Sequence, residues 1–296
     1  MKRLALFALL VALGTVIAHG QAPSWSADIS EIRRVATLIP GRKPVRINVL
    51  KFAESRRTKN FSVKGEPATP SVQARTVFQV VYPDGYVMVD AGMDEPMHKQ
   101  IGRGAEGEPY FAEQAQQVEK ALRGARSIVF THEHGDHVTG VIRTPYLAEL
   151  APKTILTRAQ VNTLETRPQF PDLKITEEQA QRYHIIDYEK YMAFAPGWTL
   201  IKAAGHTPGS QMMFITLESG REYLLIGDAA WHMDGVRKVA GKDAPWIVED
   251  TAAVNAQLKW LNGLYTGEKN LVIVASHDDD EHKELVAKKL LGGRLE

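Results

Sequence analysis

Cysteine is absent from the 296-residue sequence. Its absence excludes disulfide bonds and removes thiolate from any metal site, so the remaining protein ligands are histidine, aspartate and glutamate. A strong net charge is also absent: the formal charge is +1 and there is no long basic stretch, which argues against a nucleic-acid partner. With 44% hydrophobic and 24% charged residues, the composition is that of an ordinary globular protein.

Long hydrophobic runs are absent beyond the N-terminus. Two basic residues precede an apolar run at 4–18, and small residues stand at Ala18 and Gly20. This arrangement is typical of a secretory signal. A membrane anchor is the alternative, but the run is shorter than the roughly 20 residues that a spanning helix needs. We therefore predict a signal peptide at 1–20, a single domain at 21–296, no stable membrane span, and a periplasmic or secreted location. Oligomeric state is not indicated.

Apolar periodicity predicts helices between groups of short strands. Helices are expected at 29–38, 110–125, 158–166, 250–265 and 281–291. Strands are expected at 46–55, 127–130, 153–157, 182–188, 198–205, 211–218, 222–229 and 270–278, with a hairpin at 77–92 that turns at Pro83-Asp84-Gly85. Residues 56–71, 167–174 and 231–248 are expected to be irregular. This order of elements favours groups of antiparallel hairpins in two packed sheets, with helices outside.

Four of the predicted strands end in polar residues. These are the segments THEHGDH at 131–137, GHTPGS at 205–210, DAAW at 228–231 and SHDDD at 276–280. Strands that deliver polar side chains to one rim are a common way to build a site on a rigid scaffold. We expect these segments to meet.

The segment at 131–137 has the spacing of a metal site. His132 and His134 are two residues apart, so an extended chain points both imidazoles the same way. Gly135 permits an unusual backbone angle and an immediate turn, after which Asp136 and His137 can serve a second ion. His206 is expected to complete the first site, His277 the second, and Asp228 to bridge the two. The predicted ligands are therefore His132, His134, Asp136, His137, His206, Asp228 and His277. Two divalent ions are expected, with Zn²⁺ as the default, although Mn²⁺, Fe²⁺ and Co²⁺ accept the same ligands.

The other histidines are interpreted as ordinary surface or core residues. They are His98, His184, His232 and His282, while His19 lies in the predicted signal peptide. The acidic run from Asp278 to Glu281 is interpreted as the solvated start of the last helix, where acids favour the helix dipole.

At these residues the chain resembles the metallo-β-lactamase-fold hydrolases. The resemblance rests on His132-x-His134-x-Asp136-His137, His206 after a glycine, Asp228 after a glycine, and His277 after an apolar strand. It implies an α/β (α+β) fold, namely an αββα sandwich of two mixed sheets with external helices and a di-metal centre at one edge. It also implies that Asp90, in MVDAG, supports the metal site from behind.

A pair of cations implies hydrolysis. A bound metal ion lowers the pKa of water from 15.7 to about 7, and a second cation polarises the bond to be cut. We expect attack by a hydroxide bound at the two ions. Asp228, as the bridge, and Asp136, as a group that orients water or carries a proton, are the expected catalytic residues. The chain has no G-x-S-x-G motif that would suggest a serine nucleophile.

Within that family, the motif spacing is most similar to that of the N-acyl homoserine lactonases, including the 22-residue step from His206 to Asp228. The resemblance implies opening of a lactone or cleavage of a related ester. Many such lactonases carry a tyrosine where this chain has Trp231, and candidate substitutes are Tyr223, Tyr265 and His232. Alternative functions are β-lactamase and phosphoester or organophosphate hydrolase. A non-catalytic metal-binding protein and an iron-binding redox module are the non-hydrolase alternatives.

The walls of a small-molecule pocket are expected from the segments at 55–75, 164–175 and 231–248. Five side chains are the apolar candidates for contact with an acyl chain, namely Trp231, Met233, Trp246, Phe170 and Tyr191.

Overall fold

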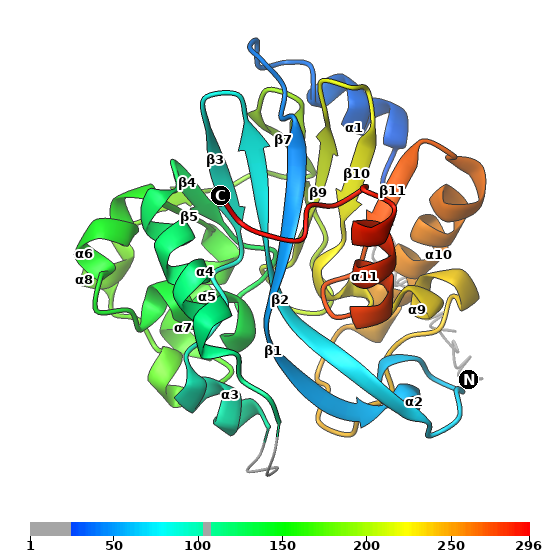
Figure 1. Cartoon of the computed structure of the whole chain (residues 1–296), viewed down its shortest axis with the longest axis horizontal. Coiled ribbons are helices and arrows are strands. Elements are labelled where there is room, and N and C mark those ends of the chain that lie inside the picture. The colour runs from blue at the N-terminus through cyan, green and yellow to red at the C-terminus, as the bar shows by residue number, and fades with distance from the viewer. Residues whose placement is uncertain (1–24, 103–107) are drawn as a thin grey trace, which may run out of the picture.

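The computed structural model of the protein describes residues 25–102 and 108–296. Two β-sheets stand side by side between two groups of helices (Figure 1). The first sheet has the order β1-β2-β3-β4-β5-β6 and the second the order β11-β10-β9-β8-β7. The predicted signal peptide at 1–20 lies outside the described residues. No helix of the described part is long and apolar enough to cross a membrane.

Both sheets are mixed. Sheet one contains β1 (Arg46–Thr58), β2 (Pro70–Tyr82), β3 (Gly85–Val89), β4 (Ser127–Val129), β5 (Thr154–Thr157) and β6 (His184–Ile186). Sheet two contains β7 (Tyr191–Ala195), β8 (Trp198–Lys202), β9 (Gln211–Thr216), β10 (Glu222–Leu225) and β11 (Leu271–Val274). Strands β2–β3, β7–β8, β8–β9 and β9–β10 follow each other closely in the chain and pair antiparallel, as does β1 with β2. Strands β3 to β6, and β10 with β11, pair parallel, and each of these connections contains at least one helix. The expected antiparallel hairpins thus describe only part of each sheet.

The helices form the two outer layers. Sheet one is covered by α3 (Glu95–Ile101), α4 (Ala112–Gly124), α5 (Gly135–Ile142), α6 (Leu147–Leu150), α7 (Arg158–Thr166) and α8 (Glu177–Ala180). Sheet two is covered by α1 (Ile29–Val35), α9 (Met233–Lys238) and α10 (Thr251–Gly267), and α11 (Asp279–Ala287) packs beside β2. One apolar core lies between the sheets and one lies under each helical layer. The expected αββα sandwich is confirmed.

The predicted loop at 56–71 is shorter than expected at both ends, and β2 begins before the predicted hairpin at 77–92. The segment at 56–71 was expected to be irregular, but β1 runs to Thr58, α2 (Lys59–Ser62) follows, and β2 starts at Pro70. The pair β1–β2 extends beyond the rest of the sheet as a long ribbon (Figure 1). Its polar composition concealed the strands because buried polar side chains satisfy one another across it, as where the Arg75 guanidinium donates to the Ser55 hydroxyl at 3.1 Å.

Short helices were the other elements that the periodicity did not reveal. The segment at 231–248, expected to be irregular, contains α9, and α3 and α5 were not expected at all. Each spans at most eight residues, so it shows about two turns of the helical period, too few to distinguish from a loop. Helix α5 matters most, since it begins inside the histidine-rich segment.

Candidate metal centre

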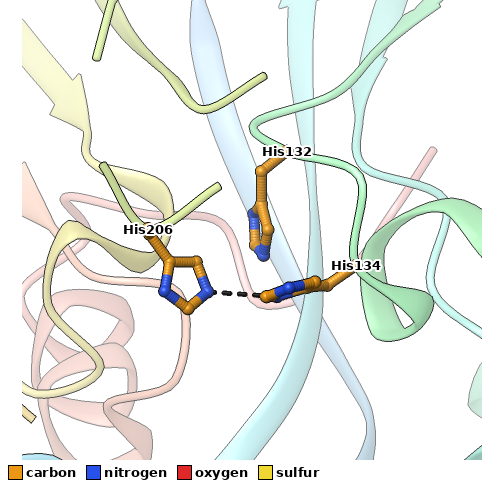
Figure 2. A group of neighbouring side chains, drawn as sticks. All are labelled: His132, His134 and His206. Atoms are coloured by element: carbon orange, nitrogen blue, oxygen red, sulfur yellow. Dashed lines mark hydrogen bonds between the residues drawn. The ribbon is translucent and has the colours of Figure 1, made fainter. Parts of the chain in front are cut away.

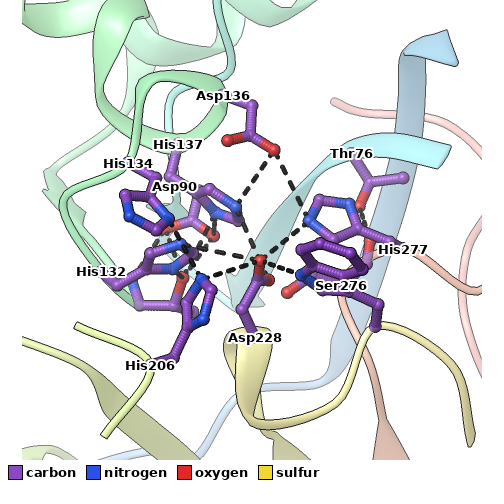
Figure 3. Close-up of polar contacts among 12 residues, drawn as sticks. Thr76, Asp90, His132, His134, Asp136, His137, His206, Asp228, Ser276 and His277 are labelled. Atoms are coloured by element: carbon purple, nitrogen blue, oxygen red, sulfur yellow. Dashed lines mark hydrogen bonds and ion pairs between the residues drawn. The ribbon is translucent and has the colours of Figure 1, made fainter. Parts of the chain in front are cut away.

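The seven predicted ligands meet at one edge of the two sheets (Figure 3). His132 and His134 lie in the loop after β4, and Asp136 and His137 in the first turn of α5. From the second sheet, His206 follows β8, Asp228 follows β10 in a short 3₁₀ turn, and His277 follows β11. Strand ends on neighbouring sheets thus bring together residues that lie up to 145 positions apart in the chain, His132 to His277.

Three of these side chains form what we call the histidine group, namely His132, His134 and His206 (Figure 2). Their ligand atoms lie within 4.8 Å of one another, and His134 Nδ1 is 3.1 Å from His206 Nε2. The expectation that the extended chain points His132 and His134 toward one place agrees with this arrangement.

A second set, the mixed group, consists of Asp136, His137 and His277. Nε2 of each imidazole lies 3.5 Å from Asp136 Oδ2. Gly135, which precedes this group, does not have the unusual backbone angle that we expected: it is the first residue of α5 and its φ is not positive. A Cβ at this position would lie 2.9 Å from Met97 Sδ, so close packing is what favours glycine here.

Asp228 lies between the two groups. Its Oδ2 is 3.2 Å from Nε2 of His277 and 3.4 Å from Nε2 of His206, and Asp228 forms a third cluster with His132 and His137. The preceding Gly227 has a φ of 53°, a conformation that glycine adopts without strain. This turn aims the Asp228 carboxylate at the space between the groups.

Three imidazole rings are oriented by hydrogen bonds at Nδ1, the ring nitrogen that points away from the centre. Nδ1 of His137 donates to Asp90 Oδ2 at 2.8 Å, Nδ1 of His277 donates to the Ala74 carbonyl at 2.7 Å, and Nδ1 of His206 donates to a carboxylate oxygen of Glu249 at 2.9 Å. Each bond holds a ring proton on Nδ1 and turns Nε2 toward the centre, where the lone pair of a neutral imidazole can bind a metal ion. Asp90, expected to support the site, also accepts from the Thr131 amide in the histidine loop, at 2.7 Å.

Burial keeps the histidine group in the neutral form. It lowers the pKa of His134 to about 3 and the pKa of His132 well below its ordinary value. Burial, and then the nearby Lys242 ammonium, lower the pKa of His206. Neutral imidazole is the form that binds a metal ion, so these side chains are ready to act as ligands near neutral pH.

The carboxyl groups are ionised although they are buried. Burial alone would raise the pKa of Asp136, but His137 and Arg75 outweigh it and hold that pKa well below its usual range. The same balance applies to the pKa of Asp228, where neighbouring histidines outweigh burial. Burial would lower the pKa of His137, yet Asp136 and Asp90 raise it well above its ordinary value. The centre therefore attracts positive charge.

Three buried ligand atoms have no hydrogen-bond partner among the described residues. They are Nε2 of His132, Nε2 of His137 and Oδ1 of Asp228. A buried polar atom without a partner costs free energy, so most such atoms in proteins are satisfied by water or an ion. These three belong to one cluster and face the same small space. Nitrogen and oxygen donors in this arrangement fit divalent metal ions.

The centre lies at the floor of a cleft of about 480 Å³. Trp231 and Trp246, two of the five predicted pocket residues, line it together with His134, His206 and Asp228. The remaining walls come from Phe61, Ile101, Ile247 and Val248 on the apolar side and from Arg57, Gln73, Arg75 and Gln169 on the polar side. All three segments expected to form the pocket contribute at least one residue.

The other three predicted pocket residues do not line this cleft. Met233 is buried in the core under α9 and α10, Phe170 packs against the core of the other helical layer, and Tyr191 packs near α1, where its hydroxyl accepts from the Asp28 amide. The candidate substitutes for the lactonase tyrosine are also elsewhere: Tyr223 lies between the sheets, Tyr265 contacts Arg237, and His232 caps α9. The apolar character of a side chain in the sequence therefore did not show whether it lines the cleft or packs in the hydrophobic core.

The acidic run from Asp278 to Glu281 begins α11, as we expected, but it is only partly solvated. Asp278 and Asp279 are buried, whereas Asp280 is exposed. Asp278 caps α11 and accepts from the Met233 amide at 2.8 Å, which fixes the loop next to His277. The histidines that we interpreted as ordinary surface or core residues are placed as expected. His98 and His282 are buried and contact backbone carbonyl groups, and His184 is exposed.

Four further residues of the site were not identified from the sequence. Arg75 pairs with Asp136 at 2.6 Å, and Glu249 pairs with Lys242 at 3.0 Å behind His206. Glu133, between two predicted ligands, accepts from the Thr207 hydroxyl at 2.7 Å and so ties the histidine loop to the His206 loop. Trp231 was expected in the wall, but its indole also donates to Asp228 Oδ2 at 2.7 Å. Only Glu133 carried a sequence signal, because it lies inside the motif.

The family model of the metallo-beta-lactamase superfamily matches residues 72–277, more than half of the chain. This chain belongs to the metallo-beta-lactamase superfamily. The match spans every predicted ligand, and the chain is accordingly a metallo-hydrolase of that superfamily. A search of curated protein sequences finds no match.

Several solved structures share the fold of this chain. An N-acyl homoserine lactone hydrolase with N-hexanoyl-L-homoserine bound at its catalytic metal centre is 20% identical, with a TM-score of 0.62 over 82% of this chain and 96% of that one. A dizinc quorum-quenching lactonase is 13% identical, with a TM-score of 0.58 over 80% and 90%. A probable metal-dependent hydrolase from Staphylococcus aureus is 14% identical, with a TM-score of 0.61 over 81% and 91%.

Proposed function

We propose that this protein is a dinuclear metal-dependent hydrolase that opens a lactone ring or cleaves a related ester carrying an acyl chain. One observation carries the proposal: seven ligand-type side chains converge at the floor of a cleft with an aromatic and aliphatic wall. An enzyme for such a substrate needs polar chemistry at the ester and an apolar surface for the chain. The lactonase folds with which the chain aligns support the same substrate class.

The histidine group would hold one ion and the mixed group the other, with Asp228 shared between them. Zn²⁺ is the metal that we propose, since imidazole and carboxylate are its usual ligands when thiolate is absent. When bound, the ions would supply hydroxide near neutral pH and stabilise the negative charge that develops on the ester oxygen.

The side chains of the protein orient these groups. Arg75, itself buried, holds the Asp136 carboxylate at 2.6 Å, and the Trp231 indole holds the Asp228 carboxylate at 2.7 Å. Trp231 donates its one N–H to Asp228. We therefore propose that Trp231 does not bind the substrate carbonyl, in contrast to the tyrosine that stands at this position in many lactonases. The Trp231 ring would then form part of the apolar wall of the cleft, next to the metal centre.

The charges of the cleft favour a neutral substrate. Its two arginines among the described lining residues are already paired, Arg75 with Asp136 and Arg57 with Glu108. A dianionic phosphate monoester would find the charge of both guanidinium groups already balanced by a carboxylate, whereas a neutral lactone needs no counter-charge. Apolar walls from Phe61, Trp246 and Ile247 suit an acyl chain.

A substrate panel on metal-quantified protein tests the proposal. N-acyl homoserine lactones, simple aryl esters, phosphotriesters and β-lactams would be compared, with acid release followed in weakly buffered solution. We expect the highest kcat/KM on lactones or esters and two ions per chain. His206→Ala should abolish turnover, and His184→Ala, at an exposed histidine away from the cleft, should not. A best substrate that is a β-lactam, or iron with NADH-linked oxygen reduction, would overturn it.

Export remains part of the proposal. The predicted signal at 1–20 implies a mature chain that begins at Gln21. N-terminal analysis of the full-length protein expressed in a Gram-negative host, after periplasmic extraction, would give Gln21 as the first residue. Recovery of uncleaved protein in the membrane fraction would favour the anchor instead.

A further inference from the structure

A buried ion pair stands directly behind the metal centre. The side chains of Lys242 and Glu249 are 1% and 5% exposed, and Lys242 Nζ lies 3.0 Å from Glu249 Oε2. That same carboxylate oxygen accepts the Nδ1 proton of His206 at 2.9 Å. Lys242 Nζ also donates to the backbone carbonyl of Asp228 at 2.5 Å and lies 5.8 Å from the centre of the Trp231 ring. One ammonium thus contacts two separate parts of the site.

The pair also closes a short segment, which we call the strap, at residues 242–249. Between its two charged ends the strap carries Trp246, Ile247 and Val248, all of which line the cleft. At its far end the Asp250 amide donates to the Gly205 carbonyl at 2.9 Å, next to His206. The strap therefore connects the substrate wall with a ligand of the histidine group.

We propose that Lys242 and Glu249 are a positioning pair that sets the affinity of the histidine group for its ion and fixes the apolar wall of the cleft at the same time. The inference rests on the proposed function, since it assumes that His206 binds metal. Glu249 holds the His206 ring in the orientation and tautomer that a metal ligand needs. Lys242 balances the charge of Glu249 and anchors the turn that carries Asp228.

A purely structural role would have a different signature. A buried ion pair is costly to desolvate, and apolar replacements of similar volume often restore or improve stability. An apolar pair at 242 and 249 would therefore satisfy a structural requirement. It would leave His206 without its acceptor, and outer partners of metal-bound histidines are typically worth about 10–100-fold in metal affinity.

The double variant Lys242→Met/Glu249→Leu provides the test. Metal-free protein would be titrated with Zn²⁺ against a chromophoric chelator, and hydrogen exchange of residues 243–248 would be measured with and without Zn²⁺. We expect a loss of about 10–100-fold in affinity for one of two ions and a smaller loss for the other, because removal of Lys242 also releases the turn that carries the shared Asp228. Zn²⁺ should protect residues 243–248 from exchange in the parent protein and much less in the variant.

Two further variants keep the test decisive. Glu249→Gln retains volume and an acceptor oxygen, so it should recover most of the affinity that the double variant loses. If the double variant does not fold, Glu249→Leu with Lys242 retained takes its place and should lose the same affinity relative to Glu249→Gln. Arg33→Met/Glu222→Leu removes a remote ion pair between α1 and β10 and should leave both affinities unchanged. A double variant that binds two ions as tightly as the parent overturns the positioning role. A parent protein that binds no ion overturns the proposed function instead.

Discussion

The histidine group and the mixed group lie side by side but are supported differently. Partners of the mixed group come from the sheet: Arg75 and the Ala74 carbonyl belong to β2, and Asp90 directly follows β3. His206 of the histidine group is held by Glu249, on a strap outside both sheets. Because rigid elements position side chains more accurately than loops, the mixed group is the preformed half of the centre and the histidine group is the half that the strap can adjust.

The largest expected effect comes from the residue that the two groups share. Asp228→Ala removes a carboxylate that lies 3.2 Å from His277 and 3.4 Å from His206. We expect metal content to fall below two ions and kcat/KM to fall by far more than about 100-fold, the upper range for an outer partner. Metal analysis and lactone hydrolysis would measure this. Asp280→Ala, at an exposed acid, is the control, and full metal content in Asp228→Ala would show that the groups are independent.

Arg75→Met should affect the mixed group through charge. Arg75 is a buried cation paired with Asp136, so its removal from metal-free protein leaves the carboxylate with His137 alone as a counter-charge, at a cost below the roughly 3–5 kcal/mol of a fully unpaired buried charge. A bound cation can compensate the same carboxylate. The variant should therefore unfold at a much lower temperature than the parent without Zn²⁺, and Zn²⁺ should raise its midpoint more than it raises that of the parent. Equal increases in the two proteins would contradict this account.

Asp90→Asn should weaken the mixed group more than the histidine group. Asp90 has a φ of 62°, a conformation that asparagine tolerates, so the backbone can be retained. Asparagine cannot accept from both His137 Nδ1 and the Thr131 amide as the two carboxylate oxygens do. We expect a loss of about 10–100-fold in affinity for one ion. Competition with a chelator would measure the affinity for each ion. An equal loss of affinity for both ions would mean that the two groups do not bind independently.

The smallest effect is expected at Trp231→Phe. This change keeps an aromatic wall and removes the indole N–H that donates to Asp228. A hydrogen bond to a charged group contributes about 1.5–3 kcal/mol. We expect the lower end, a fall in kcat of roughly 10-fold, because Asp228 retains His277 and His206 beside its carboxylate. Selectivity between short-chain and long-chain lactones should remain, whereas Trp246→Ala should reduce it. If Trp231→Phe instead raised KM for all lactones with kcat unchanged, the indole would be binding substrate.

Prediction from the sequence succeeded where the signal was local. The strands at 127–130 and 270–278 and the helices at 158–166 and 250–265 have clear apolar periods, and the structure contains each of them. The ligand-type residues stood out because several histidines and acids in one short segment have few other physical uses. Prediction failed where polar residues were buried, as in the ribbon of β1 and β2 and at Asp278, because polarity in sequence does not reveal a partner across the fold.

The sequence alone determined the candidate ligands, their spacing and the strands that deliver them, because these depend on neighbouring residues. Tertiary structure decided which side chains stand behind the ligands and which face the cleft. Arg75, Lys242 and Glu249 are ordinary charged residues in the chain and became parts of the site only because β2 and the strap pack against the metal centre. Burial and pairing are properties of packing between distant segments, and they set the charge, the tautomers and the walls of this site.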